Sequence, residues 1–195
     1  MIIGTVKETK ASENRVALSP EVVKNLIKQG FECCIEAGAG VASNFSDAAY
    51  ETAGAKIIQT AKDVCNQSDV LVKVNAPSIE EIANLKEGSA LLSFIYHLNN
   101  ADLISQLNAK KVTVFSMDAI PRISRAQSMD ALSSQANLAG YKAVILGAQH
   151  SARIFPMLMT AAGTITPSKV LIFGAGVAGL QAIGTAKRLG AVVEV

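Results

Sequence analysis

The residues with the clearest chemical potential form a glycine-rich loop near the end of this 195-residue chain. The loop, Gly174-Ala-Gly-Val-Ala-Gly179, directly follows the apolar run 170–173 and precedes a helical pattern that reaches Leu189. A strand, a G-x-G-x-x-G loop and a helix together form the context of the dinucleotide-binding fingerprint. Backbone N–H groups at the start of such a helix hold a pyrophosphate, which the helix dipole also favours. We therefore predict a nucleotide-binding loop at residues 174–179, with a purely structural turn as the alternative.

Each glycine of the loop has its own predicted role. Gly174 permits the tight turn, Gly176 lets the backbone approach a pyrophosphate, and Gly179 lets the helix pack closely on the strand. A similar segment at residues 38–43, Gly-Ala-Gly-Val-Ala-Ser, lacks the third glycine, and no helix follows it at once. We interpret that segment as a loop that needs a positive φ angle.

A second polar segment, residues 121–134, could supply side chains to a ligand. Gln127 can both donate and accept hydrogen bonds, Asp130 can accept from hydroxyl groups, and Arg122 can pair with Asp130 or with a phosphate. The spacing alone favours a helix N-terminus, because Ser124 and Gln127 fit a capping box and Asp130 suits a first helical turn. Both interpretations are open from the residues alone.

Short apolar runs alternate with helical patterns over residues 1 to about 120. The predicted strands are 2–6, 31–35, 56–58, 70–74, 90–96 and 112–116, and the predicted helices are 20–29, 46–52, 61–66, 79–85 and 101–107. This alternation predicts an α/β fold with a doubly wound parallel sheet. Beyond it we expect a long, well-buried helix over 128–149, a second helix over 154–161 and a linker over 164–168. The long helix has an apolar face made of Leu132, Ala136, Ala139, Ala143 and Leu146.

These elements predict three parts: an N-terminal α/β domain over 1–127, bridging helices over 128–163, and an incomplete Rossmann dinucleotide-binding domain over 164–195. The fingerprint places an acidic ribose ligand about 20 residues beyond the glycines, close to where the sequence stops at Val195. We therefore expect the sequence to be a truncated part of a longer chain.

Composition excludes several classes of function. The net charge of +2, with 5% aromatic residues and no Trp, provides neither the field nor the stacking surface that nucleic acids need. Cys33, Cys34 and Cys65 are odd in number and irregularly spaced, so we expect reduced core cysteines of a cytosolic protein and no metal site. The uncharged run 170–186 holds four glycines and is predicted to be strand, loop and helix, not a membrane span.

Three stretches together resemble the alanine dehydrogenase and nicotinamide nucleotide transhydrogenase superfamily. They are Lys7-Glu8 with Glu13-Asn-Arg-Val-Ala-Leu-Ser-Pro20, the segment 121–141, and the glycine loop with Leu189-Gly-Ala191. The segment Pro121-Arg-Ile-Ser-Arg-Ala-Gln-Ser-Met-Asp130 is similar to the loop of the NAD(H)-binding component of proton-translocating transhydrogenases. The resemblance spans essentially the whole chain.

This resemblance implies an oxidoreductase that passes hydride between NAD(H), bound here, and NADP(H), bound by a partner subunit. It implies a catalytic triad of Arg122, Gln127 and Asp130 beside the nicotinamide and its ribose, with added contacts from Ser133 and Ser134. The other implied cofactor contacts are Gly174, Ala175, Gly176, Val177, Ala178 and Gly179. A homodimer is also implied, in the cytoplasm and attached to the inner membrane through subunits that couple the reaction to proton movement.

Two alternative functions remain. An alanine-dehydrogenase-like enzyme must bind a small carboxylate and move protons, and Arg15, Lys73 and His97 lie at or near the positions such an enzyme uses. Each of the three also fits an ordinary structural role. A non-catalytic remnant or binding module is the other alternative. NADH oxidation that depends on pyruvate and ammonia would indicate the first, and failure to bind NADH would indicate the second.

Overall fold

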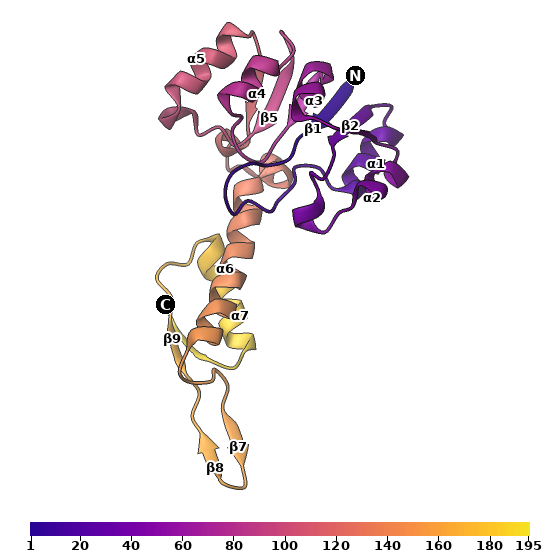
Figure 1. The fold of residues 1–195 in the computed structure, drawn as a ribbon. Helices are drawn as coiled ribbons and strands as arrows, with labels where there is room; N and C mark the ends of the chain where they lie inside the picture. Colours follow the sequence, from indigo (N-terminus) through magenta and orange to yellow (C-terminus); the bar gives the residue numbers. More distant parts are fainter. The chain divides into compact units, whose positions relative to one another are not determined.

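The computed structural model describes residues 1–195, and the chain forms two compact units, Met1–Ile120 and Pro121–Val195 (Figure 1). Buried apolar residues form two clusters within the first unit and one within the second. No helix is both long enough and apolar enough to cross a membrane.

The first unit is built on a six-stranded parallel sheet with the order β3-β2-β1-β4-β5-β6. The strands are β1 (Ile2–Thr5), β2 (Glu32–Glu36), β3 (Lys56–Ile58), β4 (Val70–Val72), β5 (Ala90–Ser93) and β6 (Thr113–Ser116). The chain begins in the middle of the sheet and winds outward in both directions, so the predicted α/β, doubly wound fold is confirmed. All six predicted strands are present, although β4 and β5 are shorter than expected.

Helices cover both faces of this sheet. They are α1 (Pro20–Lys28), α2 (Asp47–Ala53), α3 (Ala61–Gln67), α4 (Ile79–Asn84) and α5 (Ala101–Ala109). Val23 of α1 and Tyr50 of α2 are buried in one apolar cluster, and the residues of α3, α4 and α5 are buried in the other. Adjacent Cys33 and Cys34 lie in different clusters, as the alternation of side chains along a strand requires, and all three cysteines are free and buried.

The second unit contains a strand–helix–strand motif packed on one long helix. Its elements are α6 (Ala131–His150), β7 (Leu158–Thr160), β8 (Gly163–Ile165), β9 (Lys169–Leu171), α7 (Val177–Arg188) and β10 (Val192–Glu194). Strands β9 and β10 pair in parallel. The core of the unit joins α6 to α7 through Val144, Phe155, Ala182 and Ala186, with β9 and β10 residues packed against them.

The predicted helix over 154–161 is wrong, because the structure has an antiparallel β-hairpin there. Leu158 pairs with Ile165 and Thr160 with Gly163, so part of the predicted linker is strand β8. Pro156 disfavours helical backbone at Phe155 before it, and Gly163 takes a φ of +138°, which side chains rarely allow. Both hairpin strands are exposed, so their residues do not alternate between apolar and polar as those of a half-buried strand would.

The orientation and burial predicted for the long helix are also wrong. Only Gly140 and Val144 of α6 are buried, whereas Ala139, Ala143 and Leu146 of the predicted face are exposed. The packed row instead follows steps of four residues through Ala136, Gly140 and Val144. A glycine carries no hydropathy signal, so the apolar pattern did not single out the residue that makes the closest contact.

Candidate functional site

The glycine loop connects strand β9 to helix α7, as the fingerprint requires. Gly174 has a φ of +93°, so it forms the tight turn predicted for it. Gly176 is the N-cap of α7, and Leu180 donates its N–H to the Gly176 carbonyl at 2.8 Å. No side chain caps this helix, and its first turn contains no acidic residue. Its first N–H groups therefore lack a side-chain acceptor and point to a place where an anion is favoured.

Gly179 lies against the carbonyl group of Gly174, at the start of the same loop. A Cβ at this position would lie 2.9 Å from the carbonyl carbon of Gly174 and closer still to the carbonyl oxygen. The fingerprint predicts that this glycine serves helix–strand packing, but the nearest strand-side atom belongs to Ile172, at 3.9 Å. The absence of a side chain at Gly179 is therefore required mainly by the loop conformation, and less by the packing of the helix on the strand.

Helix α6 approaches the same loop through Gly140. A Cβ on Gly140 would lie 2.9 Å from the carbonyl carbon of Ala178 and 3.0 Å from its Cα, and closer still to its oxygen. The two helices therefore touch backbone to backbone beside the glycine loop. Sequence reasoning missed this residue, although a glycine in the middle of a helix is costly enough to be a signal.

A pocket of about 370 Å³ opens at the glycine loop. Its lining brings the two predicted segments together: Arg122, Leu132, Ser133, Ala136, Phe173, Gly174, Gly176, Val177, Ala178 and Gly179. One wall comes from α6 and the segment before it, and the other from the loop and the start of α7. Of the predicted site residues, Gln127, Asp130, Ser134 and Ala175 do not line it.

Asp130 is the N-cap of α6. Its carboxylate accepts from the Ser133 N–H at 2.9 Å and from the Ser133 hydroxyl at 2.6 Å. The Ser133 hydroxyl, with help from the Arg122 charge, lowers the pKa of Asp130. The Ser134 hydroxyl donates to the Asp130 carbonyl at 3.0 Å. Asp130 is therefore ionised at neutral pH, and it holds Ser133, which lines the pocket.

The capping box proposed for Ser124 and Gln127 is absent. Residues Ser124–Met129 form a 3-10 turn that has no side-chain cap. Gln127 is exposed, and its carbonyl accepts the Asp130 N–H at 3.3 Å. Helix α6 begins at Ala131, three residues after the predicted start at 128, and the Asp130 side chain caps it by accepting from the Ser133 N–H. The side chain of Gln127 thus has no capping role in this fold.

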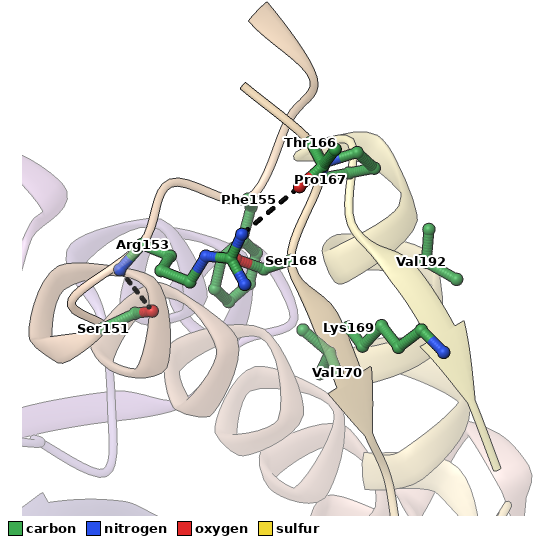
Figure 2. Close-up of a pocket in the computed structure, with 9 residues that line it drawn as sticks. All are labelled: Ser151, Arg153, Phe155, Thr166, Pro167, Ser168, Lys169, Val170 and Val192. Carbon is green, nitrogen blue, oxygen red and sulfur yellow. Dashed lines mark hydrogen bonds between the residues drawn. The ribbon is translucent and has the colours of Figure 1, made fainter. Parts of the chain in front are cut away.

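A second pocket, of about 610 Å³, lies at the amino ends of β9 and β10 (Figure 2). Arg153 reaches across it, and its Nη2 donates to the Thr166 hydroxyl at 3.2 Å. Phe155, Val170 and Val192 supply apolar surface. This pocket contains no predicted site residue and shares none with the glycine-loop pocket, so the candidate site remains at the opposite, carboxyl end of β9.

In the first unit, two of the three polar groups considered for a small-carboxylate substrate, Arg15 and Lys73, form internal ion pairs. The Arg15 guanidinium binds both carboxylate oxygens of Glu13, at 2.8 and 2.6 Å, and lowers the pKa of Glu13 to about 2. Lys73 is buried, with 2% of its side chain exposed, and pairs with Glu81. His97 lies in the exposed turn His97–Asn99.

Glu8 is connected to the Arg15–Glu13 ion pair through Asn75. Its carboxylate accepts from the N–H of Val74 at 2.7 Å and from the Asn75 side chain at 3.0 Å, and Asn75 also donates to Glu13 at 3.0 Å. These contacts tie the loop after β1 to the end of β4. No group of three or more His, Cys, Asp or Glu side chains is placed to hold a metal ion.

Comparison with known proteins assigns the family. The model for the alanine dehydrogenase/PNT N-terminal domain matches residues 4–139, and the model for the C-terminal domain matches residues 143–195. The chain belongs to the alanine dehydrogenase/PNT family. It is 54% identical to an NAD(P) transhydrogenase subunit alpha chain of Rhodospirillum rubrum, over 99% of this chain and 52% of that protein.

More distant relatives carry both family names. The chain is 51% identical to NAD(P) transhydrogenase subunit alpha of Haemophilus influenzae, with 100% of this chain and 38% of that protein covered. It is 34% identical to alanine dehydrogenase of Bacillus subtilis, with 100% and 51% covered. The chain thus spans about half the length, or less, of the curated relatives it matches.

Solved structures of the family have the same fold. A transhydrogenase from Sinorhizobium meliloti superposes with a TM-score of 0.95 at 49% identity, covering 99% of this chain and 57% of that one. An L-alanine dehydrogenase gives a TM-score of 0.85 at 31% identity, covering 98% and 53%. Both agree with the α/β architecture of the two units.

Proposed function

We propose that this chain provides the NAD(H)-binding component of a proton-translocating NAD(P) transhydrogenase, an oxidoreductase that transfers hydride between NAD(H) and NADP(H). The observation that carries the proposal is the glycine-loop pocket, where an uncapped helix N-terminus faces Arg122 and Ser133. The names of the relatives at 51–54% identity support the same function.

The residues of the pocket suit a dinucleotide. The N–H groups of Val177, Ala178 and Gly179 lie in the first turn of an uncapped helix and can donate to a pyrophosphate. Open space beside Gly176 leaves room for a ligand to approach the backbone, since an added Cβ there would meet no atom within 4 Å. Ala175 lies between the first two glycines, where a small side chain does not obstruct this approach. The positive Arg122 side chain adds an attraction for phosphate.

The segment before α6 would position the reactive end of the cofactor. When bound, NAD(H) supplies the hydride or accepts it, and direct transfer needs aligned rings and excluded water more than a protein base. Gln127 is exposed and has no capping role, so its amide can bind a carboxamide or a hydroxyl group. The ionised Asp130 can accept from ribose hydroxyls while it caps α6, and Ser133 and Ser134 lie within its reach.

We further propose that the chain acts within an assembly. Its partners would be a second copy, an NADP(H)-binding subunit and membrane subunits that couple hydride transfer to proton movement, so it would lie in the cytoplasm beside the inner membrane. The exposed hairpin of β7 and β8 supports self-association, because Met157, Leu158, Met159 and Ile165 all leave apolar surface open. The similarity to proteins named as alpha subunits of NAD(P) transhydrogenase supports the NADP(H)-binding and membrane subunits as the other partners.

Alanine dehydrogenation is the second candidate, favoured by the relatives that carry that name. The ion pairs of the first unit weigh against it. Glu13 neutralises Arg15, and Glu81 neutralises the buried Lys73, so neither cation is placed as a free carboxylate receptor. Exchanging the carboxylate partner of a buried cation for a small ligand costs free energy, because the displaced carboxylate is left buried without a cation.

The test is hydride transfer by the full-length protein together with its NADP(H)-binding subunit. We expect NADH-dependent reduction of NADP⁺ that requires both proteins, and no NADH oxidation with pyruvate and ammonia. Gln127→Asn keeps the amide but shortens its reach, and should slow transfer by about tenfold or more with little change in NADH affinity. Arg125→Gln, an exposed neighbour outside the predicted triad, is the control. Pyruvate-dependent activity without transhydrogenation would contradict the proposal.

A further inference from the structure

The two walls of the glycine-loop pocket come from two helices that meet at one residue. Leu132 and Ala136 of α6 line one wall, and the first turn of α7 lines the other. One turn beyond Ala136, Gly140 is buried against the backbone of Ala178. The closest contact between the helices therefore lies next to the pocket and on the same row of α6 that lines it.

This contact leaves no room for a side chain. An added Cβ on Gly140 would lie 2.9 Å from the Ala178 carbonyl carbon and closer still to its oxygen, where real Cβ atoms are essentially never found. The neighbouring atoms belong to the backbone of a helix, so they cannot rotate away as a flexible side chain would. Any side chain at this position must push α6 and α7 apart.

Gly147 on the same helix provides the contrast. An added Cβ there would meet nothing within 4 Å, and the residue is exposed. Glycine is a poor helix former at both positions. The close approach of Ala178 therefore explains the glycine at position 140 but not the one at 147.

We propose that Gly140 is a positioning residue for the nucleotide site, an inference that rests on the proposed function. Its missing side chain sets the separation between Arg122 and Ser133 on one wall and the first N–H groups of α7 on the other. A ligand that reaches both walls, such as a dinucleotide with a pyrophosphate, depends on this separation. A nucleoside without phosphate does not engage the helix N-terminus and depends on it much less.

The experiment measures ligand dissociation constants of the full-length protein by calorimetry, with ADP-ribose and adenosine as probes. Gly140→Ala should weaken ADP-ribose binding by about tenfold or more, and change adenosine binding by about twofold or less. Gly147→Ala should leave both constants within about twofold of the wild type. A merely structural role of Gly140 would lower the melting temperature but leave the ratio of the two constants unchanged.

Hydrogen exchange of the wild-type protein provides a second measurement that does not depend on the folding of the variant. ADP-ribose should slow exchange of the amides around residue 140 of α6 as well as those of 177–180. Protection confined to 177–180, or an unchanged ratio of dissociation constants in Gly140→Ala, would overturn the inference. If the wild type binds neither NADH nor ADP-ribose, the proposed function fails and the inference fails with it.

Discussion

Substitution of Lys73 by methionine tests whether this lysine is a structural partner or a substrate-binding group. Its side chain is 2% exposed and that of Glu81 is 11% exposed, so the pair is almost free of solvent. Methionine fills the space of the alkyl chain but leaves the Glu81 carboxylate buried without a cation. Breaking a buried ion pair on one side costs about 3–5 kcal/mol, and we expect the lower end because Glu81 keeps its bond to the Ser78 N–H.

The assay is hydrogen exchange of the full-length Lys73→Met protein, read on segments covering β4, α4 and β5. A loss of about 3 kcal/mol corresponds to roughly 100-fold faster exchange of the most protected amides. Glu81→Gln in the same chain removes the unpaired charge and preserves the capping box with Ser78, so the double variant should recover most of the protection.

NADH affinity serves as the internal control for Lys73→Met, because Lys73 lies in the first unit and the glycine-loop pocket in the second. Unchanged exchange in Lys73→Met, combined with the loss of a pyruvate-dependent activity, would refute the structural reasoning. That result would assign Lys73 to a substrate, as in the alanine-dehydrogenase alternative.

Substitutions at three further positions test the other polar contacts. Tyr50→Phe removes the buried 2.8 Å bond to the Leu18 carbonyl and should cost about 1–3 kcal/mol in urea unfolding. Burial raises the pKa of Tyr50 to about 12, above the ordinary 10.0. The stability that the neutral Tyr50 provides is therefore full below pH 10.0 and is lost as the pH rises toward 12. A wild-type protein that loses no stability between pH 10.0 and about 12 would contradict this. Arg15→Gln should raise the pKa of Glu13 from about 2 toward 4.5 in an NMR titration, because the variant lacks the guanidinium that stabilises the carboxylate. In the wild type, the stabilisation from this ion pair is full above pH 4.5 and is lost as the pH falls through about 2. Asp130→Ala should lower the stability of α6 in urea unfolding through the lost cap, whereas Asp130→Asn keeps the cap, so weaker NADH binding by the asparagine variant would assign the charge to the ligand.

The first unit was predictable because its central strands are largely buried on both faces. Runs such as 70–74 and 90–96 are almost continuously apolar, which is the pattern of parallel strands under two layers of helices. Helix starts were also visible, since Ser19 caps α1 and Pro20 occupies its first position, as the sequence suggested. Strand ends were less visible, because the apolar run continues through Phe94, Ile95 and Tyr96 although β5 ends at Ser93.

The second unit was harder to predict because its signals are local and weak. The hairpin of β7 and β8 is exposed on both strands, and Leu158 and Met159 favour helix as much as strand. The face of α6 was misplaced because its closest contact uses Gly140, which adds nothing to hydropathy. Asp130 caps α6, whereas Ser124 begins a separate 3-10 turn, and the spacing of residues in this segment does not reveal that division.

NADH binding to the glycine loop is the central claim, and a calorimetric titration of the full-length protein tests it most directly. Gly179 and Gly184 both lie on α7, but a Cβ on Gly179 collides with the Gly174 carbonyl, whereas one on Gly184 meets nothing within 4 Å. We predict saturable binding by the wild type, binding weakened by about tenfold or more in Gly179→Ala, and an affinity within about twofold of the wild type in Gly184→Ala. No binding by the wild type, or equal affinity of all three proteins, would contradict the account.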